Sequence, residues 1–305
     1  MTQLNLSILG LDQLGVSIGM ALSKNSQDIH IVGFDKNKKV SERIESQKIF
    51  SETTNSLQDA LRSTDVVVFS PSVDEVQPIL KEMAPFLMDE AMIVYCGYLP
   101  GQAAKWAQEI LPDNVFFTAL TPTFNPKYIE QNLPQEPCAD LFENSLMFIS
   151  HAPSVPPAVA DMTITLTRLL GAKPHFSDLL EVDGLQVLTN ILPIISAAAV
   201  MLEAKNEPGW QDAAKLAGEL YAYSTRPLDH LMEQYDLGQS LLINRDYSLR
   251  VIANLQNALA KLSTLISAGK SEELKTVLED LIASRNAWMK TRQELAQPAE
   301  PKKKK

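Results

Sequence analysis

A turn near the start of the chain carries the residue types that bind a phosphate group. An apolar run ends at Gly10, Gly15 opens an amphipathic segment, and a second apolar run ends at Asp35. Glycines at this spacing allow a tight turn, and the helix that follows offers unpaired N–H groups to a pyrophosphate. A carboxylate roughly twenty residues past the second glycine can accept hydrogen bonds from a ribose. The pattern predicts a dinucleotide site formed by Gly10, Leu11, Asp12, Leu14, Gly15 and Asp35.

One position of this turn departs from the usual pattern. The middle glycine of a G-x-G-x-x-G turn lets the backbone approach the pyrophosphate, and that position is Asp12 here. A carboxylate there adds bulk and a like charge beside the pyrophosphate. An alternative interpretation is therefore an α/β domain whose turn is only structural.

Strand-like and helix-like segments alternate in the first half of the chain and must position this turn. Strands are predicted at 4–10, 29–35, 65–69, 91–95, 115–119, 146–149 and 174–176. The segments between most of them have polar or helical patterns. This alternation predicts an α/β fold over residues 1–178, with a Rossmann-type doubly wound parallel sheet covered by helices on both faces.

After residue 178 the strand-like runs stop and long helical segments follow. Helices are predicted at 183–204, 210–223, 227–235, 237–268 and 271–296. Several have apolar faces, which predicts an all-helical dimerisation and substrate domain over 179–296 and a homodimer formed through it. The alternative is a monomeric bundle that closes on itself. The polar, lysine-rich segment 297–305 is predicted to be disordered.

Composition limits the classes of function. The 305 residues are enough for two domains with separate cores, and the net charge of −10 argues against nucleic acid as a partner. Cys96 and Cys138 are the two cysteines, with no C-x-x-C pair and no histidine cluster nearby, so no metal site or disulfide framework is predicted. We expect a cytoplasmic protein, because the chain opens on a strand pattern without a signal peptide.

The longest apolar segment, 187–202, is the candidate for a membrane span. It contains Thr189, Asn190, Pro193 and Ser196. These residues favour a buried helix, so we expect no membrane partner.

Landmarks spread over nearly the whole chain match the motifs of one enzyme family. The turn at 10–17 resembles a G-L-G-x-x-G-G-S motif, and Gly33-Phe-Asp35 resembles a G-Y-D strand end. In the helical half, the segments that resemble motifs of the same family are Glu181-Val-Asp-Gly184, Leu192-Pro193, Ser224-Thr-Arg226 and Leu242-Ile-Asn244. No single landmark is specific, but in their order and spacing together the chain resembles the prephenate/arogenate dehydrogenase family of tyrosine biosynthesis.

The resemblance implies an enzyme that oxidatively decarboxylates prephenate or arogenate with NAD or NADP. It implies that Arg226 binds a substrate carboxylate. An alternative interpretation is that Arg226 forms an ion pair with Asp229 or Glu233. Pro227 predicts a helix start there, with Arg226 extended. NAD is favoured over NADP because Asp35 would face a 2′-phosphate as a like charge, a repulsion that Lys36, Lys38 and Lys39 could soften.

The departures from the family fall at the positions of its chemistry. The family's serine near the reacting hydroxyl is Tyr98 here, and the histidine that hydrogen-bonds this hydroxyl is Thr121. In the S-H-L-P-H segment, the serine is Asn190 and the second histidine is Ile194. Thr121 cannot be a base at neutral pH, and a tyrosine with an ordinary pKa of about 10 is a poor one. The sequence therefore leaves the catalytic residues unknown.

Three interpretations stay open. The first is a dehydrogenase of the prephenate/arogenate type with a rearranged site. The second is a catalytically silent relative that binds a nucleotide or a partner in a regulatory or scaffold role. The third is a relative that acts on another hydroxy acid, as the 6-phosphogluconate-type dehydrogenases do. Those use a lysine on the helix after the nucleotide domain, and residues 179–204 contain none.

Overall fold

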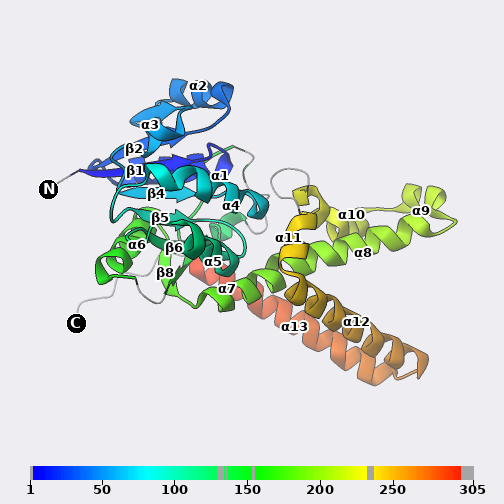
Figure 1. Ribbon diagram of the computed structural model, residues 1–305. Coiled ribbons are helices and arrows are strands. Elements are labelled where there is room, and N and C mark those ends of the chain that lie inside the picture. Colours follow the sequence, from blue (N-terminus) through cyan, green and yellow to red (C-terminus); the bar gives the residue numbers. More distant parts are fainter. Residues whose placement is uncertain (1–2, 129–133, 135, 153–154, 232–236, 297–305) are drawn as a thin grey trace, which may run out of the picture. The chain divides into compact units, whose positions relative to one another are not determined.

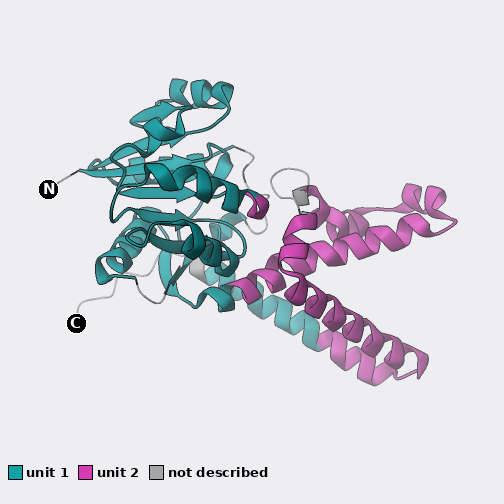
Figure 2. Cartoon of the chain, in the orientation of Figure 1, with its two compact units in different colours: residues 1–71, 75–182, 280–305 teal, residues 72–74, 183–279 magenta. Residues whose placement is uncertain are grey.

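The computed structural model describes residues 3–128, 134, 136–152, 155–231 and 237–296. The tail predicted to be disordered, 297–305, lies outside them. The chain divides into two compact units, coloured in Figure 2: the first contains residues 1–71, 75–182 and 280–305, and the second contains 72–74 and 183–279. The predicted domain limits, 1–178 and 179–296, stay a prediction.

The first unit is built on an eight-stranded sheet with the order β3-β2-β1-β4-β5-β6-β7-β8 (Figure 1). Its strands are β1 (Leu4–Leu9), β2 (Ile29–Phe34), β3 (Glu52–Thr54), β4 (Val66–Phe69), β5 (Met92–Tyr95), β6 (Phe116–Pro122), β7 (Leu146–His151) and β8 (Lys173–Phe176). Every residue of β4 and β5 is buried, as expected for central strands covered on both faces. The predicted doubly wound sheet followed by a helical region is confirmed.

Two features of the sheet differ from the prediction. β7 runs antiparallel to β6, with Thr121 opposite Phe148. A parallel return needs a crossover, and the described part of the β6–β7 connection holds only the 3₁₀ helix η2 (Pro126–Tyr128). The edge strand β3 was not predicted because its sequence, Glu-Thr-Thr, has no apolar signal.

Helices cover both faces of this sheet (Figure 1). They are α1 (Gln13–Asn25), α2 (Lys38–Ser46), α3 (Leu57–Leu61), α4 (Val73–Met83), η1 (Ala84–Phe86), α5 (Pro100–Ile110) and α6 (Pro157–Leu169). Side chains of β4 alternate between two core clusters, because successive residues of a strand point to opposite faces. Val68 joins the cluster that contains Val16 of α1, and Val67 joins the cluster that contains Leu80 of α4 and Ala103 of α5.

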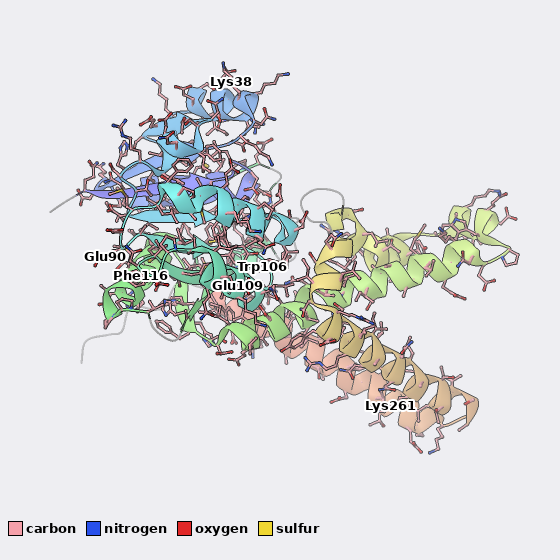
Figure 3. All side chains as sticks on the ribbon, in the orientation of Figure 1. Lys38, Glu90, Trp106, Glu109, Phe116 and Lys261 are labelled. Carbon is pink, nitrogen blue, oxygen red and sulfur yellow. The ribbon has the colours of Figure 1, made fainter. Side chains whose placement is uncertain are left out.

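The outer surfaces of these helices carry charged side chains (Figure 3). On α2, Lys38 Nζ lies 3.7 Å from Glu42 Oε1, one helical turn away. Both side chains are mostly exposed, so this pair contributes little to stability. The two apolar clusters therefore supply most of the stability of the sheet and its helices.

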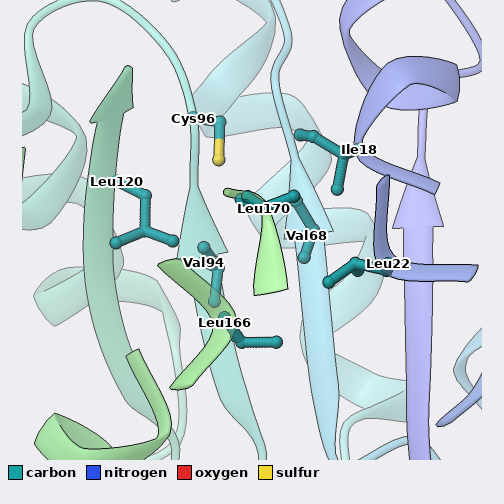
Figure 4. Close-up of a pocket in the computed structure, with 8 residues that line it drawn as sticks. All are labelled: Ile18, Leu22, Val68, Val94, Cys96, Leu120, Leu166 and Leu170. Atoms are coloured by element: carbon teal, nitrogen blue, oxygen red, sulfur yellow. The ribbon is translucent and has the colours of Figure 1, made fainter. Parts of the chain in front are cut away.

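A small cavity remains between the sheet and the helices α1 and α6 (Figure 4). Its volume is about 10 Å³, and its walls are apolar side chains and one thiol: Ile18, Leu22, Val68, Val94, Cys96, Leu120, Leu166 and Leu170. Burial raises the pKa of the Cys96 thiol to about 12. A cavity of this size holds at most one water, and without polar partners it stays dry.

We expect Val94→Ile to raise the unfolding free energy by roughly 0.5–1 kcal/mol, because the added methyl group fills this cavity. Val67→Ile is the matched control on the same sheet. Val67 is fully buried in the opposite cluster, and an extra methyl there overpacks at a cost of about 1–3 kcal/mol. Urea midpoints measure both changes. An equal loss in the two variants would show that the cavity cannot take a methyl group.

The second unit is helical. It contains the second half of α7 (Leu179–Gln186), the π-helix η3 (Val187–Ile191), α8 (Leu192–Asn206), α9 (Trp210–Leu216), α10 (Glu219–Thr225), η4 (Arg226–Leu231), α11 (Leu237–Ile243), α12 (Arg245–Ser267) and the start of α13 (Ser271–Ala296). Two predicted helices are broken. Gly218 is extended between α9 and α10, and Asn244 separates α11 from α12. Both are weak helix formers, and the prediction underestimated them.

The helical run α7–η3–α8 is less buried than predicted. By length and composition this run, Leu179–Asn206, is the one helix in the described part of the chain that could span a membrane, with a mean hydropathy of 1.9. Only 22% of its apolar window is buried in the single chain, and Leu188 and Leu202 are exposed. The predicted buried helix is therefore wrong for the isolated chain, because no other part of the chain that the structure describes covers these side chains.

Candidate functional site

The predicted dinucleotide turn lies at the carboxyl edge of the sheet. β1 pairs with β2 on one side and with β4 on the other, so the strand order reverses at β1. In doubly wound sheets, ligands bind outside the carboxyl ends of the strands at such a switch point. Gly10 directly follows β1, Asp35 directly follows β2, and both therefore lie beside it.

Both glycines of the turn are required by its geometry. Gly10 has a φ of +98°, and its N–H donates to the carbonyl oxygen of Phe34 at 2.9 Å. A Cβ on Gly15 would lie 2.0 Å from the carbonyl oxygen of Gly10. The first glycine therefore gives the turn its conformation, and the second lets α1 pack against the turn.

Asp12 forms the N-cap of α1. Its Oδ1 accepts a hydrogen bond from the N–H of Gly15 at 2.8 Å, and its backbone is extended, as is usual for an N-cap. Burial raises the pKa of Asp12 above its ordinary value, and the nearby Asp35 carboxylate raises it further. The N–H groups of Gly15 and Leu14 oppose this shift by stabilising the charged form. The side chain of Asp12, which was predicted to disturb a pyrophosphate, thus caps the helix end that a pyrophosphate would approach.

Asp35 is held in place by two backbone donors. Its Oδ2 accepts from the N–H of Leu11 at 3.1 Å, and its Oδ1 accepts from the N–H of Asn37 at 2.8 Å. A carboxylate has about four acceptor positions, so two remain for ribose hydroxyls. Leu11 takes part through its backbone only, since its side chain is buried in the core.

The residues present fit a dinucleotide with one exception. The turn at Gly10, the close approach at Gly15 and the fixed carboxylate of Asp35 are the features that such a cofactor needs. Leu14 lies in the first turn of α1, where its N–H faces the cap. The exception is Asp12, which already accepts from this helix end.

A second set of contacts against α1 was not predicted. The side-chain amide of Gln13 donates to the carbonyl oxygen of Pro134, and the N–H of Cys138 donates to Ser17 Oγ at 3.1 Å. The connection between β6 and β7 therefore packs on the first turns of α1. No signal in the sequence pairs these positions, which are far apart in the chain.

Tyr98 lies in a constrained turn between β5 and α5. Leu99 is buried and has φ +56° and ψ +57°, a left-handed conformation that is unfavourable for leucine. The phenol of Tyr95 donates to the carbonyl oxygen of Tyr98 at 2.6 Å and fills the space beside Gly97, where a Cβ would lie 2.3 Å from the phenol oxygen. Burial raises the pKa of Tyr98, so its phenol is neutral and suits hydrogen bonding better than proton removal.

Thr121 lies near the end of β6, at the same carboxyl edge as Tyr98. β6 continues past Ala119, the residue that pairs with the last residue of β5, Tyr95. Thr121 is half-buried and brings a hydroxyl where the family has an imidazole. The structure thus gathers the turn, Asp35, Tyr98 and Thr121 at the carboxyl edge of one sheet.

The other predicted site residues belong to the second unit. Asn190 lies in η3 and Ile194 in α8, and both are half-buried. A π-helix directly before Pro193 has a physical reason, because proline lacks the N–H that would bond to the preceding turn and its ring crowds that turn's carbonyl. Short π-segments are frequent at functional sites, and the sequence analysis missed this one.

Arg226 is exposed at the junction of α10 and η4. Its φ of −53° and ψ of −35° are helical, so the predicted extended geometry before Pro227 is wrong. α10 runs directly into η4, and this continuity outweighs the bias that proline imposes. Within the described residues no ion pair joins Arg226 to Asp229, and Glu233 lies outside them.

The described residues contain no group of three or more His, Cys, Asp or Glu side chains that could hold a metal ion. The candidate site therefore consists of the glycine turn, the carboxylates of Asp12 and Asp35, and the hydroxyl groups of Tyr98 and Thr121.

Comparison with known proteins agrees with this fold. The family described as prephenate dehydrogenase, nucleotide-binding domain, matches residues 18–169. Cyclohexadienyl dehydrogenase of Zymomonas mobilis is 23% identical over 193 residues, which are 63% of this chain and 64% of that protein. The match thus spans slightly less than two thirds of the curated relative.

Two solved structures show how far the fold extends. Prephenate dehydrogenase from A. aeolicus, in complex with hydroxyphenyl propionate and NAD+, has a TM-score of 0.82 and 19% identity, covering 94% of this chain and 99% of that one. Arogenate dehydrogenase from Synechocystis has a TM-score of 0.76 and 17% identity, covering 93% and 100%. With its nucleotide-binding domain matched and its fold shared along nearly the whole chain, this protein belongs to the prephenate/arogenate dehydrogenase family.

Proposed function

We propose that this protein is a nicotinamide-dependent dehydrogenase that oxidatively decarboxylates a cyclohexadienyl acid, prephenate or arogenate, in the cytoplasm. The observation that carries the proposal is the turn at Gly10 and Gly15 beside the fixed carboxylate of Asp35, at the switch point of a family nucleotide-binding domain. Membership of the family favours this function over the catalytically silent alternative.

The chemistry divides between the cofactor and the chain. A bound nicotinamide supplies the hydride acceptor. In the substrate, the carbinol carbon loses hydride, its hydroxyl loses a proton, and the departure of carbon dioxide leaves an aromatic ring. The neutral phenol of Tyr98 is suited to donate a hydrogen bond at the sheet edge, and Thr121 can orient a hydroxyl but cannot take its proton. We therefore expect slow turnover, with water as the proton acceptor.

NAD is the proposed cofactor in preference to NADP. A 2′-phosphate would face the carboxylate of Asp35, which the N–H groups of Leu11 and Asn37 hold in place. Two of the three nearby cations already face a carboxylate: Lys36 lies 3.3 Å from Glu75 and Lys38 lies 3.7 Å from Glu42. The third, Lys39, is exposed on α2 and is the cation that could partly offset this repulsion. Calorimetric titration with both nucleotides tests this preference, and tighter binding of NADP would contradict it.

The activity itself is tested by absorbance in the reduced-nicotinamide band, with prephenate or arogenate and with NAD or NADP. We expect slow reduction with one of the acids, and weaker dinucleotide binding in Asp35→Asn than in the wild type. Asp28→Asn is the matched control, since Asp28 is an exposed carboxylate before β2, at the opposite edge of the sheet. Binding without reduction by any pair would leave the silent relative as the better interpretation.

Arg226→Lys is expected to weaken binding of the ring acid about tenfold or more while leaving the melting temperature unchanged, because two charge-assisted hydrogen bonds to a carboxylate need a guanidinium. The exposure of Arg226 and the absence of an ion pair with Asp229 in the described structure support a binding role over a structural one. Titration with prephenate and a thermal melt measure the two effects.

Arg250→Lys is the control for this prediction. The guanidinium of Arg250 lies over the ring of Tyr247, 4.5 Å from its centroid, in the same helical unit. We expect this variant to keep full ligand affinity. A lower melting temperature for Arg226→Lys with unchanged affinity would assign Arg226 a structural role instead.

A homodimer through the helical unit is the proposed assembly. Several large apolar side chains of this unit are solvent-exposed, with Leu216 88% and Leu220 86% exposed and Leu188 and Leu242 more than half exposed. Surfaces of this kind mark protein–protein contacts. Sedimentation velocity tests the assembly, and a monomer at micromolar concentration would favour the self-closing bundle. The negative net charge makes nucleic acid an unsuitable partner, and a dimer interface would cover the apolar run in place of a membrane.

A further inference from the structure

The first turn of α1 carries the N–H groups that a pyrophosphate needs, and a carboxylate of the chain already engages them. Asp12 Oδ1 lies 2.8 Å from the nitrogen of Gly15, and the N–H of Leu14 also stabilises the charged carboxylate. Asp12 thus takes the position of an anion at this helix end. A dinucleotide and this side chain compete for one site.

We propose, resting on the function above, that Asp12 is a built-in competitor of the cofactor: its carboxylate must leave the helix end before a pyrophosphate binds there, and binding is accompanied by uptake of a proton. The effect is confined to ligands that carry the pyrophosphate. Related turns that carry glycine at this position have no side chain that competes for the helix end.

The charges around Asp12 support this inference. Asp35 is a like charge and disfavours the ionised form of Asp12. Lys36, next to Asp35, is paired with Glu75, and Gln13 is neutral with its amide donating to Pro134. Within the described part of the first unit, no cationic side chain therefore stabilises the charged form of Asp12 when a second anion arrives.

The direction of the pH dependence follows from proton linkage. Burial already raises the pKa of Asp12 in the free protein, and a bound anion raises it further. The complex therefore holds more protons than the free protein, so affinity increases as the pH falls. Uptake of one proton per ligand strengthens binding by up to about tenfold per pH unit.

Two substitutions separate the charge of Asp12 from its role as a cap. Asp12→Asn keeps a side-chain oxygen for the N–H of Gly15 but cannot ionise, and Asp12→Gly frees the helix end. Calorimetric titration with NAD at several pH values, repeated in two buffers of different ionisation enthalpy, gives both the dissociation constant and the number of protons taken up.

We expect the wild type to take up protons, and both variants to bind NAD about tenfold more tightly or better at neutral pH with no proton uptake. Adenosine, which has no pyrophosphate, should bind the wild type and the variants equally. Asp28→Asn, which removes an exposed carboxylate at the opposite edge of the sheet, should bind NAD as the wild type does.

The outcomes separate this inference from the proposed function. Binding of NAD with equal affinity and no proton uptake in all four proteins would overturn the competitor and leave the cofactor proposal intact. Tighter binding in the variants without any pH dependence in the wild type would overturn the proton uptake. Folded proteins that bind neither NAD nor NADP, Asp12→Gly included, would overturn both the inference and the proposed function.

Discussion

Replacement of Gly15 by alanine is expected to lower the unfolding free energy by about 3 kcal/mol and to abolish dinucleotide binding. The new Cβ would lie 2.0 Å from the carbonyl oxygen of Gly10 and 3.2 Å from its carbonyl carbon. These are main-chain atoms, so no side-chain rotation relieves the contact. α1 would have to move away from β1 and displace the backbone of Leu11, which holds Asp35.

Two further glycine substitutions serve as comparisons for this prediction. In Gly19→Ala the Cβ would meet the ring of Phe50, which can turn, so we expect a smaller loss of stability and retained binding. In Gly209→Ala the Cβ has no neighbour within 4 Å, and we expect almost no change. Denaturant midpoints and titration with NAD measure all three variants. A Gly15→Ala midpoint equal to that of Gly209→Ala would contradict the close packing of the turn against α1.

The sheet could be predicted because its signal is local. β4 and β5 are continuous apolar runs, buried on both faces, and such runs are recognisable without knowing their neighbours. The turn could be predicted for the same reason, since Gly10 and Gly15 are needed by contacts within a few residues. β3 and the antiparallel direction of β7 depend on distant partners, and the prediction missed both.

The role of Asp12 was only half predictable. Its charge beside a pyrophosphate follows from the sequence, whereas its bond to the N–H of Gly15 depends on a rotamer that only the structure shows. A signal was present, since aspartate directly before a helix is a preferred N-cap. Combining the two would have predicted the competition at the helix end.

The helical half was harder to predict, because its boundaries depend on packing. Gly218 and Asn244 interrupt predicted helices, and the π-helix η3 precedes Pro193. Apolar periodicity also cannot tell whether a helix face is covered by its own chain or by a partner. That ambiguity explains why the burial of 187–202 was predicted wrongly for the single chain.

The combined substitution Thr121→His and Tyr98→Ser is expected to raise the rate of prephenate oxidation about 10²–10⁴-fold, the usual contribution of a positioned general base. Both positions lie at the carboxyl edge of the sheet, at the end of β6 and after β5. The backbone of the turn should persist, because the phenol of Tyr95 bonds to the carbonyl oxygen of residue 98, which a serine also provides. Tyr98→Phe, which keeps the ring and loses the hydroxyl, is the control for stability.

The pH profile distinguishes a restored base from an enlarged pocket. An imidazole with an ordinary pKa of about 6.5 accepts a proton only when neutral, so kcat/KM of the double variant should rise with pH through that region. A serine at position 98 combined with the native Thr121 has no group that titrates there, and its profile should be flat over the same range.

A double variant that folds and binds NAD, yet oxidises prephenate no faster than the wild type, would mean that the pocket has diverged beyond these two residues. In that case Asn190 and Ile194, where the family has a serine and a histidine, are the next positions to restore. Ile194 has no hydrogen-bonding group, and Asn190 offers an amide in place of a hydroxyl.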